Sequence, residues 1–150
     1  MSTGSLSVSV WRGSKKGRFA DYDVPRRDRQ TVLDVVTHIQ RYIDPSLSYR
    51  FACRVGVCGS CAMTVNGRAR WTCRTHVNQV AADGRLRIEP LRSLRVIKDL
   101  SVDMTDFFDK WAKAKGAFEP TATRTNDLAA IQPGDFKRRQ ASAGIECIGC

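Results

Sequence analysis

The chain opens with hydrophobic and polar residues in alternation, the period of two expected of a half-buried β-strand. Residues 6–10 alternate leucine or valine with serine, and residues 20–24 alternate again until Pro25 ends the run. A basic turn with glycine at both ends, residues 13–17, separates the two runs. The pattern therefore predicts a β-hairpin.

From Thr31 the hydrophobic period becomes that of an α-helix. Its apolar residues fall at i, i+3, i+4, i+7, i+10 and i+11, which is one helical face. They are Val32, Val35, Val36, Ile39, Tyr42 and Ile43. Thr31 is expected to cap the helix, Asp34 to favour its N-terminal end, and Pro45 to stop it.

Three short strands follow a loop that runs from about Tyr49 to Cys61. Residues 62–65 and 69–73 are predicted to pair across an Asn66-Gly67 turn. A last strand, in which Leu86 and Ile88 alternate with charged residues, ends at Pro90. The order strand, strand, helix, cysteine loop, strands is that of a β-grasp, so the predicted fold class is α+β with a ferredoxin-like β-grasp domain.

The pattern changes after residue 91. Met104, Phe107, Phe108 and Trp111 form an apolar stripe at helical spacing, with Gly116 as the stop. The aromatic residues of this stripe are expected in core or domain-interface packing. Residues 118–134 read as a linker, and residues 136–143 as a short helix before Cys147 and Cys150. We therefore divide the chain into a β-grasp domain (1–92), a bridging helix and linker (93–135) and the truncated start of a helical domain (136–150).

Composition excludes some classes of protein. No run approaches the roughly 18 apolar residues of a membrane span, and residues 1–10 lack the features of a secretory signal. Six cysteines without such a signal indicate a reducing compartment, where cysteines are metal ligands before disulfides. The net charge of +10 is scattered and accompanies no nucleic-acid motif, so no nucleic-acid partner is expected. An acidic protein surface or an anionic membrane face suits this charge better.

Four cysteines carry the strongest chemical signal. Cys53, Cys58, Cys61 and Cys73 have the spacing C-x4-C-x2-C-x11-C, which is the plant-type [2Fe-2S] ligand spacing. Each iron of such a cluster takes two thiolates, and the cluster accepts and passes single electrons. The spacing therefore predicts an electron-transfer site.

The residues between these cysteines fit a loop curled around a cluster. Gly56 and Gly59 remove Cβ clashes and allow positive φ. The curled backbone is expected to point N–H groups at the sulfurs, which raises the reduction potential. Ser60 is expected to add a hydroxyl donor, and Arg50 and Arg54 to add positive charge.

Other interpretations of the cysteines are weaker. Zinc ribbons favour paired C-x2-C knuckles, and disulfides need export. Cys147 and Cys150 form a lone C-x2-C motif. Three interpretations of this motif stay open: half of a zinc site, a redox dithiol, or the start of a [4Fe-4S] ligand run. His76 reads as a surface or supporting histidine and His38 as structural. No catalytic residue is predicted.

Six segments resemble one family. Residues 49–63 closely resemble the cluster loop of the iron–sulfur subunit of succinate dehydrogenase and fumarate reductase, and residues 65–68, 43–48 and 88–91 match around it. Residues 96–104 look like that family's bridge between two domains, which other [2Fe-2S] proteins lack. Residues 145–150 look like the opening of its second, helical domain. Val55 departs from the family, which often has glutamate there.

The resemblance implies a role and partners. Cys53, Cys58, Cys61 and Cys73 match the family's [2Fe-2S] ligands. The family's helical domain holds [4Fe-4S] and [3Fe-4S] clusters, whose ligands are incomplete here because the chain stops at Cys150. The implied partners are an FAD flavoprotein catalytic subunit, a membrane-anchor subunit and, indirectly, quinone. The implied location is peripheral, on the cytoplasmic side of a bacterial inner membrane.

The function predicted on these grounds is a non-catalytic electron-transfer subunit of a succinate:quinone oxidoreductase. Three alternatives stay open. One is the small electron-relay subunit of a molybdenum hydroxylase, which shares the cysteine spacing. Another is a freestanding ferredoxin, which the positive charge disfavours. The last is a zinc-stapled binding module.

Overall fold

The computed structural model describes residues 4–114, 132 and 134–145. The chain divides into two compact units, with the boundary between Asp103 and Met104. Each unit is described by itself. Within the described residues, no helix has the length and apolar character needed to cross a bilayer.

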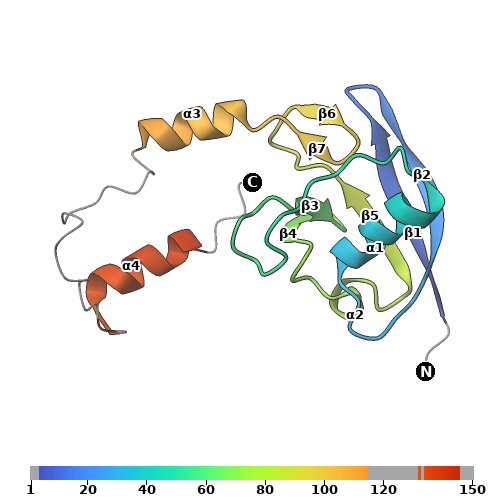
Figure 1. Ribbon diagram of the computed structural model, residues 1–150, viewed down its shortest axis with the longest axis horizontal. Helices are drawn as coiled ribbons and strands as arrows, with labels where there is room; N and C mark the ends of the chain where they lie inside the picture. The colour runs from blue at the N-terminus through green and yellow to red at the C-terminus, as the bar shows by residue number, and fades with distance from the viewer. Residues whose placement is uncertain (1–3, 115–131, 133, 146–150) are drawn as a thin grey trace. The chain divides into compact units, whose positions relative to one another are not determined.

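The first unit is built on a five-stranded mixed sheet with the order β2-β1-β5-β3-β4 (Figure 1). β1 (Ser5–Gly13) and β2 (Gly17–Pro25) form the predicted antiparallel hairpin. β3 (Ala62–Val65) pairs antiparallel with β4 (Arg68–Trp71) and with β5 (Arg85–Glu89), and β5 lies parallel to β1. This mixed sheet with its helix confirms the α+β β-grasp class.

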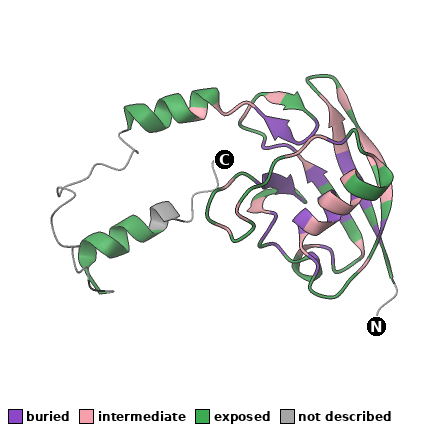
Figure 2. Cartoon of the chain, in the orientation of Figure 1, coloured by how far each residue is buried: buried purple, intermediate pink, exposed green. Residues whose placement is uncertain are grey.

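The core lies between the sheet and α1 (Val32–His38). In β5 and the first half of β1 buried residues alternate with more exposed ones, as the period of two predicts, whereas all four residues of β3 are buried (Figure 2). The helix begins with the predicted cap, because Thr31 Oγ1 accepts from the Asp34 amide at 3.2 Å and Asp34 Oδ2 accepts from the Thr31 amide at 3.0 Å. This reciprocal capping fixes where the helix begins.

The end of the helix differs from the prediction. Residues Ile39–Ile43 form a π-helical turn, η1, closed by a 2.7 Å bond from the Asp44 amide to the Ile39 carbonyl. Tyr42 and Ile43, expected on the buried face, are 73% and 44% exposed, so this part of the prediction is wrong. A π turn takes more residues per turn than an α-helix, and this rotates the last two apolar residues off the buried stripe.

Three short elements were not predicted. α2 (Val77–Val80) follows the fourth cysteine, and β6 (Val96–Lys98) pairs with β7 (Ser101–Val102) in a small hairpin after the sheet. The β6–β7 hairpin belongs to the segment that resembles the family's bridge. It is held by buried residues of its turn, Asp99 and Leu100.

The second unit contains α3 (Thr105–Lys113) and α4 (Phe136–Ile145), which correspond to the two predicted helices. No residue of α3 is buried, and Phe108 and Trp111 are 57% and 44% exposed. The expectation of core packing for this stripe is therefore wrong within the described residues, and domain-interface packing stays a prediction. Gly116, Cys147 and Cys150 and nearly all of the predicted linker lie outside them, and the domain limits at 92 and 135 stay predictions.

Candidate metal centre

The four predicted ligands come together from two segments of the first unit. Cys53, Cys58 and Cys61 lie on the loop before β3, and Cys73 lies on the turn after β4. Cys61 and Cys73 are buried, Cys53 is half-buried and Cys58 is exposed. Cys61 and Cys73 lie together in one buried cluster, and the Cys58 amide donates to Cys53 Sγ at 3.4 Å. The sulfurs are therefore associated as two pairs.

Backbone N–H groups point at the Cys53 sulfur, as the sequence predicts for this loop. The amides of Val55, Val57 and Cys58 donate to Cys53 Sγ at 3.5, 3.4 and 3.4 Å. These three bonds lower the pKa of Cys53 to about 6, because they stabilise the thiolate. The loop thus favours negative charge on this sulfur before any metal is considered.

Cys73 lies in the opposite environment. Burial, followed by its hydrogen bond to Cys61, raises the pKa of Cys73 to about 11, although the Gly56 amide donates to it. A buried thiol with such a high pKa gains most from a metal ion, since the cation replaces the proton and removes the cost of an unpaired buried charge.

Two glycines give the loop its curvature. Gly56 and Gly59 have φ of +76° and +70°, the conformations that the sequence predicts. A Cβ on Gly56 would lie 2.8 Å from Cγ of Arg74 and 3.4 Å from Cε3 of Trp71. The loop and the Cys73 turn are therefore in close contact at this point.

The turn that carries Cys73 begins earlier than predicted. β4 ends at Trp71, not at Cys73, because the Trp71 carbonyl accepts from the amides of Arg74 and Thr75 at 3.1 and 3.0 Å. Thr72 Oγ1 donates to the Cys61 carbonyl at 2.7 Å, which ties the turn to the loop. The Leu33 amide, at the start of α1, donates to the Thr72 carbonyl at 3.1 Å. These bonds hold Cys73 beside Cys61.

Two apolar side chains cover the buried cysteine pair. Leu33 packs with Cys61 and Cys73 in a small cluster, and the half-buried Tyr49 packs against it. Tyr49 also stacks on Phe51, with ring centroids 5.6 Å apart. This cover keeps water from the inner side of the site, whereas Val55 and Val57 on the outer side are 61% and 67% exposed.

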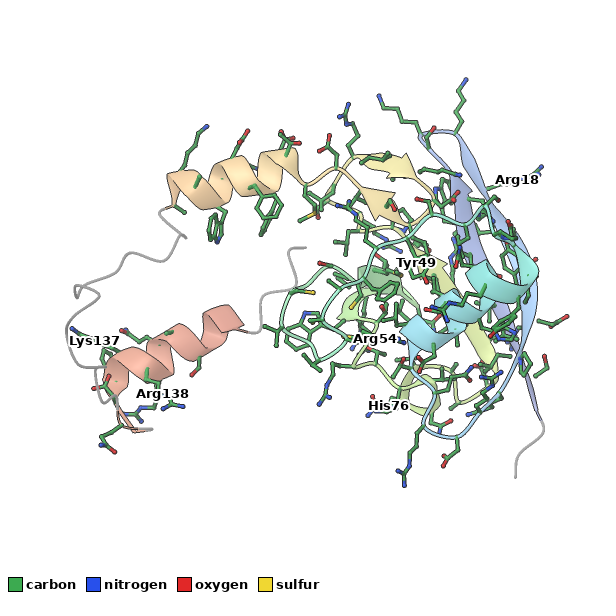
Figure 3. All side chains as sticks on the ribbon, viewed as in Figure 1. Arg18, Tyr49, Arg54, His76, Lys137 and Arg138 are labelled. Carbon is green, nitrogen blue, oxygen red and sulfur yellow. The ribbon has the colours of Figure 1, made fainter. Side chains whose placement is uncertain are left out.

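Arg54 has a partner that the sequence analysis missed. Its guanidinium lies 3.2 Å from Oδ1 of Asp34 and 5.5 Å from the ring centre of Phe51, and its φ is +61° (Figure 3). The positive charge expected from Arg54 is therefore partly offset by Asp34. This contact could have been predicted in part, because Asp34 lies in the first turn of the helix, three residues after the cap Thr31.

The remaining predicted residues play smaller parts. Ser60 is exposed, and its hydroxyl donation stays a prediction. Arg50 is exposed, and His76 is an exposed residue whose backbone pairs with Thr31. The sequence analysis did not identify Leu33, Tyr49 and Thr72, since their roles depend on contacts between distant segments.

The donor set fits a binuclear cluster. In the described part of the chain, no three or more His, Cys, Asp or Glu side chains are grouped so that they could hold a metal ion, so the fit is judged from the chemistry of the donors. Two thiol pairs, backbone N–H donors to sulfur and glycines at the tight points of the loop are what two irons with two thiolates each need. The residues present therefore suit a [2Fe-2S] cluster.

Comparison with known proteins agrees with this geometry. The 2Fe-2S iron-sulfur cluster binding domain family matches residues 6–109. A fumarate reductase iron-sulfur subunit from Mycobacterium tuberculosis is 35% identical over 140 residues, 88% of this chain and 54% of that protein. A mitochondrial succinate dehydrogenase iron-sulfur subunit from Oryza sativa is 36% identical, over 99% of this chain and 53% of that protein.

A solved structure has the same arrangement. One chain of the Mycobacterium smegmatis Sdh1 complex in the apo form superposes with a TM-score of 0.78 and 31% identity, covering 99% of this chain and 63% of that chain. The present chain thus spans about half the length of the curated relatives named above.

Proposed function

This chain belongs to the 2Fe-2S iron-sulfur cluster binding domain family, and from that premise we propose that it is the electron-transfer part of a succinate dehydrogenase or fumarate reductase. The observation that carries the proposal is the pairing of Cys61 with Cys73 and of Cys53 with Cys58 inside the domain that the family matches. The similarity to iron-sulfur subunits of both enzymes supports it.

The proposed ligands are Cys53, Cys58, Cys61 and Cys73, and the bound cluster supplies one-electron redox chemistry. The protein performs no bond-making step. Its backbone amides stabilise negative charge at Cys53, and Leu33 and Tyr49 exclude water from the buried pair. These contacts set how readily an electron is held.

The exposed side of the loop suits the approach of a redox partner. Cys58, Val55 and Val57 are exposed there, so a partner surface can come close to the ligand sulfurs. The proposed partners are a flavoprotein subunit with FAD and a membrane-anchor subunit, with quinone as the indirect acceptor or donor. The proposed location is peripheral, on the cytoplasmic side of a bacterial inner membrane. Any [4Fe-4S] and [3Fe-4S] clusters would belong to the helical domain of the complete subunit.

The test is metal analysis of the full chain, purified without oxygen from cells competent in cluster assembly. We expect iron and acid-labile sulfide in equal amounts and a one-electron EPR signal on reduction. Cys58→Ser should lose most of the iron and lower the melting temperature, because cluster binding is coupled to folding. Ser60→Ala, a change of an exposed non-ligand in the same loop, should keep both.

Two results would overturn the assignment. A folded, colourless and iron-free wild-type chain would refute the cluster. Unchanged iron content and melting in Cys58→Ser would refute the ligand set while leaving the fold intact. The presence of zinc in place of iron would favour the zinc-stapled module.

A further inference from the structure

We propose that Asp99 is a positioning residue for the cysteine loop, acting through Ser48 and Tyr49 on the cover over Cys61 and Cys73. Asp99 lies in the turn of the β6–β7 hairpin, far in sequence from every cysteine of the loop. The inference rests on the proposed function only in that the cover is taken to protect a cluster. The contacts of Asp99 are made between protein groups and do not depend on a bound cluster.

Asp99 is a buried carboxylate with a partner on each oxygen. Only 1% of the residue is exposed. Oδ1 accepts from the Gly13 amide at 2.8 Å and Oδ2 accepts from the Ser48 amide at 2.9 Å. Arg12 Nε lies 3.2 Å from Oδ1 and balances the charge. A buried carboxylate is retained only where such bonds compensate its desolvation.

The backbone at Asp99 is also under constraint. Its φ is +52°, a left-handed conformation that L-residues rarely adopt. The Asp99 amide donates to the Gly13 carbonyl at 2.7 Å, which completes a two-way link to the end of β1. The surrounding contacts hold Asp99 in a conformation that its own backbone disfavours.

These bonds of Asp99, which we call the clamp, fix the position of Ser48. Besides its amide, which donates to Asp99, its carbonyl accepts from the Leu100 amide at 3.1 Å. Its hydroxyl lies 3.0 Å from the hydroxyl of Ser101. All three polar groups of Ser48 are therefore bonded to the β6–β7 hairpin, and its position is set by that hairpin.

The next residue, Tyr49, connects Ser48 to the metal centre. Its ring packs against both the main core and the Leu33, Cys61 and Cys73 cluster. Its hydroxyl donates to Thr37 Oγ1 on α1 at 3.2 Å. Figure 3 labels Tyr49 and Arg54 where the loop faces α1. A shift of Ser48 would carry the Tyr49 ring with it and open the cover.

An Asp99→Asn substitution tests the clamp because the new side chain has one acceptor oxygen where the carboxylate has two. The amide NH2 must then face either the Gly13 or the Ser48 amide, and that donor loses its bond. Asp83→Asn is the matched control. Asp83 also accepts from a backbone amide, that of Arg85 at 3.1 Å, and pairs with the Arg85 side chain, but it lies in the turn before β5.

The first measurement is hydrogen exchange of the full chain without metal. We expect Asp99→Asn to speed exchange of the amides in residues 48–53 about tenfold, the effect of losing one charge-assisted bond. Asp83→Asn should leave these amides at the wild-type rate. If exchange rises only in residues 96–103, Asp99 anchors the hairpin alone and the proposal is overturned.

The second measurement is release of iron from the reconstituted chain to a chelator, expected to be about tenfold faster in Asp99→Asn. In a Tyr49→Leu background the same substitution should add less than about twofold, because the two changes act on one path. Additive effects would overturn the route through Tyr49. A wild-type chain without iron would refute the proposed function but leave the exchange result standing.

Ser101→Ala guards against a variant that does not fold. It removes only the hydroxyl contact to Ser48 and leaves every bond of Asp99 in place. A smaller increase in exchange at residues 48–53 supports the proposal. If Asp99→Asn does not fold, the Ser101→Ala variant decides the test. Exchange of residues 48–53 at the wild-type rate in Ser101→Ala would then overturn the proposal.

Discussion

Gly56 lies at the closest approach between the cysteine loop and the turn of Cys73, and its substitution should affect both folding and metal retention. Gly56→Ala would combine a left-handed backbone with a Cβ placed 2.8 Å from Arg74 Cγ. We expect the free energy of unfolding to fall by about 2 kcal/mol, measured by denaturant titration. Iron should also be lost faster to a chelator, because the loop must move away from the Cys73 turn to relieve this close contact.

Gly67 provides the control for backbone strain. Its φ is +81°, but a Cβ there would have no neighbour within 4 Å. Gly67→Ala should therefore cost about 1 kcal/mol from conformation alone and leave iron retention unchanged. If the two variants behaved alike, contact with Arg74 would have no role in the site.

At the residue scale, what the sequence predicted depends on local chemistry. The cysteine spacing and the two loop glycines follow from the geometry of one short loop. Their roles can therefore be predicted without knowledge of the tertiary structure. The ion pair of Asp34 with Arg54 and the contacts of Asp99 could not be predicted, because each joins residues that only tertiary structure brings near. An aspartate in a sequence does not reveal whether it is solvated, caps a helix or is buried beneath a loop.

At the element scale, Arg12 joins pieces that the sheet alone does not connect. Burial opposes its charge, but hydrogen bonds to Tyr22, Asp44 and Asp99 outweigh burial and raise the pKa of Arg12 above its ordinary value. Arg12 pairs with Asp44, and Tyr22 donates to the same carboxylate at 2.9 Å. The hairpin is thereby tied to the segment that follows η1.

The Asp44 carboxylate makes this tie depend on pH. Hydrogen bonds from Ser46, followed by those from Tyr22 and Arg12, hold the pKa of Asp44 well below its ordinary value of 3.8. Its stabilising effect is therefore complete above that ordinary pKa and is lost as pH falls toward the lower folded-state pKa. We expect urea unfolding of the metal-free chain to show a falling free energy below about pH 4.5.

Asp44→Asn should be less stable at neutral pH and show a flatter acid dependence. Asp28→Asn is the control, since Asp28 is exposed and its nearest cation, Arg29, is 3.9 Å away. Its pH profile should follow the wild type. Parallel profiles for wild type and Asp44→Asn would show that other carboxylates govern the acid transition.

The elements themselves were predictable to different degrees. β1, β2, β5 and α1 have clear periodicity, and β3 and β4 flank the Asn66-Gly67 turn, so each was found. The π turn was missed because its apolar residues continue the helical period, and only the backbone bond from Asp44 shows the change. β6 and β7 are too short for a pattern to form, and they depend on the buried contacts of Asp99.

At the scale of the whole molecule, charge and exposed surface bear on assembly. The net charge of +10 predicts an acidic partner. In the fold, arginine side chains are exposed near the cysteine loop. Arg50 lies in this loop and Arg74 lies close to it at Gly56, and both side chains are exposed, as are Val55 and Val57. The identity of the partner lies beyond what periodicity or packing can predict, because it depends on a second surface.

This arrangement predicts salt-sensitive association with the proposed flavoprotein subunit. Attraction between exposed charges is screened over about 8 Å at physiological ionic strength and over about 3 Å at 1 M salt. We expect the affinity of the full chain for the purified flavoprotein subunit to fall at least about tenfold between low and high salt, chiefly through slower association. Surface plasmon resonance at several salt concentrations measures both rates.

Position on the surface separates docking from general charge. Arg50→Gln removes a cation beside the loop, and Arg18→Gln removes one from the far end of the hairpin, where Figure 3 labels it. Both lower the net charge equally, yet only Arg50→Gln should reduce the association rate by more than about twofold and flatten its salt dependence. Equal effects of the two variants on the association rate would mean that the net charge of the chain, and not the surface around the cysteine loop, accelerates association.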